Sequence, residues 1–161
     1  MELVPVNIVC NGTAYELEVE PRTLLADLLR SSLGSKGTHI GCEHGVCGAC
    51  TVLVDGEPMR SCLMLAVQAD GRTIETVESL ELPDGSLNEL QESFHKHHGL
   101  QCGYCTSGIL MSLTALFNEE KAPSEGRIRD FIQGHICRCT GYQQMIEACV
   151  ELSGLRSKEM S

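Results

Sequence analysis

The sequence has little positive charge, few aromatic side chains and no long apolar run. Lys and Arg number 12 against 22 Asp and Glu, which gives a formal net charge of −10, and aromatic residues make up 4% of the chain. An acidic chain with few aromatics is poorly suited to bind nucleic acid or an anionic membrane surface. No apolar run approaches the length needed to span a bilayer. We therefore expect neither nucleic-acid binding nor membrane insertion.

The N-terminus also lacks the pattern of a secretory signal. Residues 1–11 contain no basic region followed by a long apolar stretch, which such signals have. We therefore expect a cytoplasmic protein. Structural disulfides are rare in that compartment, so the ten cysteines are expected to bind metal. The 161 residues suffice for two small domains, whose weak cores metal sites would help to stabilise.

The first half of the chain has the pattern of a small mixed sheet. Apolar residues alternate in residues 4–10 and 15–19 on either side of Asn11-Gly12, which predicts a tight hairpin. A helix is expected to begin after Thr23 as its N-cap and to end at Gly34. Further strands are expected at residues 51–54, 59–63 and 73–77. Together these expected strands and the one crossing helix make the β-grasp pattern.

From about residue 86 the apolar spacing becomes helical. Four segments have this spacing, around residues 87–94, 109–117, 128–132 and 145–150. Short helices with short connections predict a four-helix bundle, which makes the whole chain α+β. The turn-forming stretch 81–85 is the expected linker. The predicted domains are therefore residues 1–80 and residues 86–161.

Four cysteines of the first half have the spacing of an iron–sulfur site. Cys42, Cys47 and Cys50 follow the plant-type [2Fe–2S] spacing C-x4-C-x2-C, and Cys62 follows after eleven intervening residues, on the second strand of the expected hairpin. Nearby glycines allow the backbone to approach a cluster and direct its N–H groups at the sulfurs. Zinc also binds four thiolates, but its sites usually pair two short C-x2-4-C units. The spacing therefore favours a cluster.

A second group consists of Cys102, Cys105, Cys137 and Cys139, as one C-x2-C pair and one C-x-C pair. The first pair is expected at the start of a helix, where N-terminal amides favour thiolate. Paired cysteines are also typical of zinc sites. Spacing alone leaves zinc and a second [2Fe–2S] cluster open, and the first site in the same chain favours the cluster.

The two other cysteines and a histidine trio are expected to have no metal. Cys10 and Cys149 fall on apolar faces, where a free thiol behaves as a small hydrophobe. His95, His97 and His98 point several ways around a helix, so a solvated face is the better interpretation.

Three motifs in this order resemble the small iron–sulfur subunit of the molybdenum hydroxylases, the family of xanthine dehydrogenase, aldehyde oxidoreductase and carbon monoxide dehydrogenase. The motifs are GCEHGVCGACT at residues 41–51, QCGYCT at 101–106 and CRCTGY at 137–142, and the resemblance covers about residues 4–152. It implies a plant-ferredoxin-like β-grasp followed by a four-helix bundle. It also implies [2Fe–2S] clusters on both cysteine groups, which spacing leaves undecided for the second.

The resemblance implies an electron-transfer subunit that binds no substrate itself. Electrons would pass from molybdopterin in a large subunit through the two clusters to FAD in a medium subunit. The expected pterin is the cytosine dinucleotide, and the expected assembly is a dimer of heterotrimers. Gln101 and Cys139 match the family positions that lie beside the pterin.

Several alternatives and two departures accompany this resemblance. Residues 59–68 and 97–101 look closest to enzymes that hydroxylate N-heteroaromatic rings, such as quinoline oxidoreductase, and a carbon monoxide or aldehyde dehydrogenase is the alternative. A free-standing ferredoxin-like carrier and a zinc-stapled interaction module are further alternatives. Ser107 stands where many relatives have proline. His135 stands where many have asparagine, and is expected to be a polar residue at a helix end.

Overall fold

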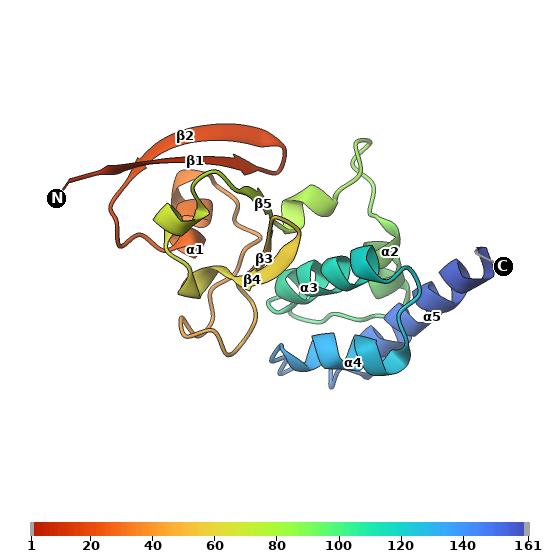
Figure 1. The fold of residues 1–161 in the computed structure, drawn as a ribbon. Helices are drawn as coiled ribbons and strands as arrows, with labels where there is room; N and C mark the ends of the chain where they lie inside the picture. Colours follow the sequence, from red (N-terminus) through yellow and green to blue (C-terminus); the bar gives the residue numbers. More distant parts are fainter. Residues whose placement is uncertain (1, 160–161) are drawn as a thin grey trace.

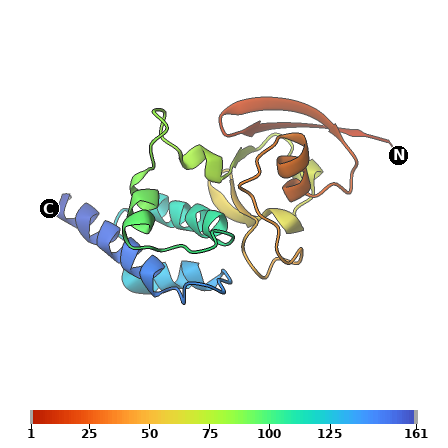
Figure 2. The same ribbon diagram turned by 180° about the vertical axis from the view of Figure 1, so that it is seen from behind.

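The fold consists of a sheet lobe beside a helical lobe. The structure is a computed structural model that describes residues 2–159, so the outermost residues of the two predicted domains, 1 and 160–161, lie outside the described part. The two ends of the chain point to opposite ends of the molecule (Figure 1). The view from behind shows the same arrangement (Figure 2). The α+β class is confirmed, and no helix in the described residues is long and apolar enough to cross a membrane.

Five short strands form one mixed sheet in the order β2-β1-β5-β3-β4. The hairpin predicted at Asn11-Gly12 is confirmed, and both turn residues have positive φ angles, 49° and 78°. The first strand pairs in parallel with the last, while the other neighbours are antiparallel. The bounds are β1 (Val4–Cys10), β2 (Thr13–Val19), β3 (Thr51–Val54), β4 (Glu57–Arg60) and β5 (Thr73–Glu75).

The helix that crosses the sheet is shorter than expected. α1 (Leu25–Asp27) continues as a π-helical turn, Leu28–Ser32, and its leucines are buried in the sheet core. Thr23 is not the N-cap, because Leu24 has that position and no side chain caps the helix. The carbonyl of Thr23 instead accepts a hydrogen bond from Ala66 N at 2.7 Å, which holds this segment in extended pairing with residues 64–66.

The four predicted helices of the second half are confirmed. α3 lies at the centre and packs against α2, α4 and also β3. Leu53 of β3 belongs to the same buried core as the helices, so α3 joins the two lobes rather than lying within one of them. The positions of the domain boundaries and linker remain predictions. The bounds are α2 (Glu89–Lys96), α3 (Thr106–Glu119), α4 (Glu125–Gln133) and α5 (Gln143–Glu159).

Candidate metal centre

The cysteines of both groups meet where the two lobes join. A pocket of about 240 Å³ at this junction is lined by six of the eight, together with neighbouring residues of their loops. All ten cysteines of the chain are free thiols. The six that line the pocket are Cys42, Cys47, Cys102, Cys105, Cys137 and Cys139.

The loop of the first group directs backbone N–H groups at a thiol. Gly45 and Gly48 have φ angles of 80° and 78°, a conformation that glycine adopts without steric cost. The N–H of Cys47 donates to the Sγ of Cys42 at 3.3 Å. This N–H and that of His44 lower the pKa of Cys42 to about 6. The loop therefore stabilises thiolate at Cys42, as the glycine content predicted.

Cys50 and Cys62 form the buried side of the first group. Cys62 does not lie on a strand as expected but in a 3-10 turn, Ser61–Leu63, directly after β4. The strand ends because Ser61 turns toward the site and donates from both N and Oγ to the Cys50 carbonyl, at 3.3 and 2.6 Å. Burial, followed by the thiol of Cys50, raises the pKa of Cys62 to about 11, and Cys42 adds a smaller contribution. The four thiols thus share one neighbourhood.

The second group runs from the interior to the surface. Cys105 is buried, Cys137 is half-buried, and Cys102 and Cys139 are exposed. Burial and the nearby thiol of Cys137 raise the pKa of Cys105 to about 12, and the thiol of Cys102 raises the pKa of Cys139. Cys105 is the N-cap of α3, whereas Cys102 lies in the preceding loop. The helix-start prediction is therefore correct for Cys105 and wrong for Cys102.

Hydrogen bonds connect the loops of the two groups. The N–H of Ile136 donates to the carbonyl of Cys47 at 2.9 Å, and the Tyr104 hydroxyl donates to the carbonyl of Ile40 at 2.7 Å. The loops also touch through glycines, since a Cβ on Gly108 of α3 would lie 2.2 Å from the Gly48 oxygen. Spacing within either motif does not predict these contacts.

The donor set fits [2Fe–2S] cores, in which each of two irons takes two thiolates. Neighbouring thiols interact in pairs: Cys42 with Cys47 and Cys50 with Cys62 in the first group, and Cys105 with Cys137 and Cys102 with Cys139 in the second. A Cβ on Gly41 would lie 3.1 Å from the Cys47 Sγ, so glycine leaves room beside the thiols. In residues 2–159 no group of three or more Cys, His, Asp or Glu side chains is placed so that it could hold one metal ion.

The positions expected near a pterin lie at the exposed edge of the second group. Gln101 is exposed beside the equally exposed Cys102, and Cys139 is exposed as well. Ser107 is buried in the first turn of α3, where its Oγ lies 3.4 Å from the Nδ1 of His39. Because Gln101 and Cys139 are exposed, the surface around them is accessible to a partner subunit.

His135 lies at a helix end, as expected, but its burial was not expected. It directly follows the C-cap of α4, as predicted, but it is 3% exposed and its Nε2 lies 2.8 Å from the Oγ of Ser112. Burial, and then the positive charge of Arg60, lowers its pKa to about 4. His135 is thus a neutral, buried side chain at the junction, which its neighbours in the sequence did not reveal.

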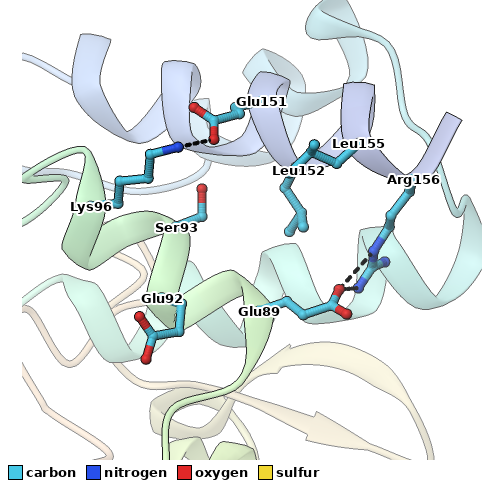
Figure 3. A pocket seen from close by; sticks show the side chains of 8 residues that line it. All are labelled: Glu89, Glu92, Ser93, Lys96, Glu151, Leu152, Leu155 and Arg156. Atoms are coloured by element: carbon cyan, nitrogen blue, oxygen red, sulfur yellow. Dashed lines mark hydrogen bonds and ion pairs between the residues drawn. The ribbon is translucent and has the colours of Figure 1, made fainter. Parts of the chain in front are cut away.

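A larger cavity lies elsewhere, between α2 and α5. It has a volume of about 350 Å³ and no cysteine in its lining. Figure 3 shows two ion pairs across it, Lys96 with Glu151 and Arg156 with Glu89. His97 also bonds Glu151, with 2.7 Å between Nε2 and Oε2, so it belongs to this helix seam, whereas His95 and His98 are exposed as expected. We interpret the cavity as a solvated groove between two helices.

The two remaining cysteines are buried in the two cores, as expected. Cys10 is 3% exposed among sheet residues, and Cys149 is 0% exposed among the helices. Burial raises the pKa of both, that of Cys149 to about 12. Both therefore stay protonated and apolar in character.

Comparisons with known proteins agree with this geometry. Residues 8–76 match the family described as 2Fe-2S iron-sulfur cluster binding domain, and residues 76–150 match the [2Fe-2S] binding domain family. The chain is 58% identical over 142 residues to the 6-hydroxypseudooxynicotine dehydrogenase complex subunit beta of Paenarthrobacter nicotinovorans, covering 88% of each chain. It is 54% identical over 151 residues to the caffeine dehydrogenase subunit gamma of Pseudomonas sp. (strain CBB1), covering 92% of this chain and 90% of the relative.

A solved structure is similar over nearly the whole chain. It is the crystal structure of quinoline 2-oxidoreductase from Pseudomonas putida 86, with a TM-score of 0.92, 48% identity and 98% of each chain covered. The chain matches two [2Fe–2S] domain families, and its relatives include subunits of oxidoreductase complexes. It therefore has an electron-transfer role within an enzyme of several subunits. The chain belongs to the small [2Fe–2S] iron–sulfur subunits of the molybdenum hydroxylases.

Proposed function

We propose that the chain relays electrons from a molybdopterin centre in a large subunit, through two [2Fe–2S] clusters, to FAD in a medium subunit. The observation that supports this most directly is the meeting of two thiol groups at one junction, where the Ile136–Cys47 hydrogen bond joins their loops. When bound, each cluster accepts and releases one electron. We also propose that the sheet lobe is a plant-ferredoxin-like β-grasp and that the helical lobe is a four-helix bundle.

The proposed ligands are the eight cysteines of the two groups. Their pairing and the backbone N–H groups directed at Cys42 support this assignment, because such N–H groups stabilise charge on ligand sulfurs. The first cluster would be held by Cys42, Cys47, Cys50 and Cys62, and the second by Cys102, Cys105, Cys137 and Cys139.

The exposed edge of the second group is proposed to face the pterin. Cys139 and Gln101 are its expected contacts there, and their exposure supports this placement. Val46, Leu63 and Ile136 are exposed apolar side chains, 56%, 61% and 56% exposed, next to the cysteines of the junction. Exposed apolar groups that gather in one patch are typical of contact with other subunits, and we propose that these three side chains contribute to such a contact. The proposed assembly is a dimer of heterotrimers with molybdopterin cytosine dinucleotide.

For the whole enzyme we propose hydroxylation of an N-heteroaromatic or related small substrate. The names of two similar proteins specify caffeine and quinoline, which are both N-heteroaromatic. The substrate is bound by the large subunit, so similarity of this chain supports the substrate class only through shared ancestry. Carbon monoxide or an aldehyde is the alternative.

The relay can be tested on the complex purified with its partner subunits. Under anaerobic conditions, quinoline is added as the probe substrate and the bleaching of FAD absorbance is followed. We expect the Cys47→Ser complex to lose FAD bleaching while its second cluster is still reduced, because Cys47 is a ligand of the first. Cys149→Ala is the matched control and should bleach like the wild type.

Bleaching at the wild-type rate in the Cys47→Ser complex would contradict the relay. If quinoline reduces nothing in the wild type, an aldehyde, the alternative substrate class, replaces it as the probe substrate. A chain that purifies without partner subunits would instead favour the free-standing carrier.

A further inference from the structure

His135 lies where the loops of the two cysteine groups touch, and the relay as proposed gives it no role. It follows Gly134, the C-cap of α4, and precedes Ile136, whose N–H donates to the Cys47 carbonyl. Its side chain is 3% exposed. A buried polar ring is costly unless it has a partner or a definite position, so its surroundings indicate what it does.

The ring is held on one side by α3 and fills a space on the other. Its Nε2 lies 2.8 Å from the Oγ of Ser112. Its Nδ1 has no hydrogen-bond partner in the described part of the chain and faces Gly48, where an added Cβ would lie 2.4 Å away. The ring is therefore packed directly against the first cysteine loop while α3 fixes its far edge.

The backbone around His135 is fixed by both lobes. Arg60 Nη2 donates to the Gly134 carbonyl at 2.6 Å, and the Tyr142 hydroxyl donates to the His135 carbonyl at 3.2 Å. Ile136 N donates to Cys47 O at 2.9 Å, and Cys137 is the next residue. One hydrogen bond thus connects the backbone of a first-group cysteine, Cys47, with the residue that precedes a second-group cysteine, Cys137, and the ring of His135 lies directly before the segment that makes it.

We infer that His135 is a positioning residue for electron transfer between the two clusters: held by Ser112, it keeps the N–H of Ile136 bonded to the Cys47 carbonyl. The inference rests on the proposed function, because only bound clusters transfer electrons. The Ile136–Cys47 hydrogen bond itself does not depend on a bound group. It assigns the role to the Nε2 hydrogen bond in addition to the volume of the ring.

The variants separate hydrogen bonding from volume. His135→Leu keeps much of the volume without polar atoms, whereas His135→Gln places an amide near the position of Nε2. Ser112→Ala removes the partner while the ring stays. Ser153→Ala is the matched control, since Ser153 is also a buried serine, with its Oγ donating to the Pro123 carbonyl at 2.7 Å, away from both cysteine loops.

Two measurements on the holoprotein test the inference. Hydrogen–deuterium exchange of the peptide that contains Ile136 should be about fivefold faster in His135→Leu and Ser112→Ala, the factor that corresponds to losing one net hydrogen bond. The magnetic interaction between the two reduced clusters in electron paramagnetic resonance should weaken in the same variants. His135→Gln and Ser153→Ala should both behave like the wild type.

Wild-type exchange and wild-type magnetic interaction in Ser112→Ala, with both clusters present, would overturn the inference. Equal loss in His135→Gln and His135→Leu would also overturn it, because volume alone would then be decisive. Iron and sulfide analysis of the wild type tests the proposed function separately. If His135→Leu does not fold, the pair of serine variants still decides the question.

Discussion

Gly108 and Gly48 set how closely α3 approaches the first cysteine loop. A Cβ on Gly108 would lie 2.2 Å from the Gly48 carbonyl oxygen, which is backbone and cannot turn aside. We expect Gly108→Ala to destabilise the protein by about 1–3 kcal/mol, the usual cost of overpacking a well-packed site. The thermal midpoint of the anaerobic holoprotein measures this loss.

Gly154 of α5 is the matched control for that substitution. A Cβ there meets nothing within 4 Å, and the residue lies inside a helix. Gly154→Ala should stabilise by about 0.5–1 kcal/mol, because alanine loses less backbone entropy than glycine on forming a helix. Equal midpoints for both alanine variants would show that the lobes do not meet at Gly108.

At the level of single cysteines, ligand and core positions should behave differently. Cys105→Ser should lower bound iron from about four to about two atoms per chain, because it removes a ligand of the second [2Fe–2S] site only. Cys149→Ala should keep all the iron, since that thiol lies in the apolar core of the helices. Colorimetric iron and acid-labile sulfide assays check both; an unchanged iron content in Cys105→Ser would refute its assignment.

Structural features that neighbouring residues determine were predictable from the sequence, and features that depend on a distant partner were not. The turn at Asn11-Gly12 needs two positive φ angles, and the sequence shows that need directly. Thr23 has the side chain of a good N-cap, yet its carbonyl pairs with Ala66, 43 positions later. The burial of His135 depends on Ser112 and on the first cysteine loop in the same way.

At the scale of elements, the contact between α2 and α5 should depend on apolar packing more than on its ion pairs. Leu152 of α5 is 5% exposed, whereas Glu151 binds Lys96 and His97 at the surface of the same seam. Leu152→Ala should cost about 2–5 kcal/mol through lost burial and the cavity it leaves. Glu151→Gln should cost far less, because exposed ion pairs are screened by water and salt.

Thermal midpoints of the two variants at low and high salt check this prediction. Only the difference between Glu151→Gln and the wild type should shrink as salt is added. A larger loss in Glu151→Gln than in Leu152→Ala would contradict the account of the seam.

Element types were predicted well, and their exact ends were not. Alternation identified the first two strands, the apolar runs and turn residues indicated the other three, with β4 shifted by two to three residues, and the 3.6-residue period identified the four longer helices. The position of Cys62 was missed because β4 ends where Ser61 bonds the Cys50 carbonyl, a contact between segments. The linking role of α3 was missed for a similar reason, since its own pattern shows a buried helix but not that β3 covers it.

At the scale of the whole molecule, removing the metal should loosen both lobes. Each cysteine group draws on separate segments of the chain, 42–50 with 62 and 102–105 with 137–139. Metal that binds only the folded arrangement stabilises it. Anaerobic chelation should therefore lower the thermal midpoint of the chain and raise hydrogen exchange most strongly in the cysteine loops, and an unchanged midpoint would contradict a structural contribution of the metal.

The two cysteine groups were found from their spacing, but their meeting at one pocket was not. That meeting depends on the contact of Gly108 with Gly48 and on the Ile136–Cys47 hydrogen bond, which join residues 60 and 89 positions apart. Spacing also left zinc open for the second group, and the family match supports two [2Fe–2S] domains.

The central claim is that the two cysteine groups hold two [2Fe–2S] clusters. The most direct test is iron and acid-labile sulfide analysis of anaerobically purified protein, combined with its visible absorbance. We predict about four irons and about four sulfides per chain, from two clusters of two irons each, and a red-brown colour. A colourless protein with about two zinc ions and no sulfide would contradict the claim.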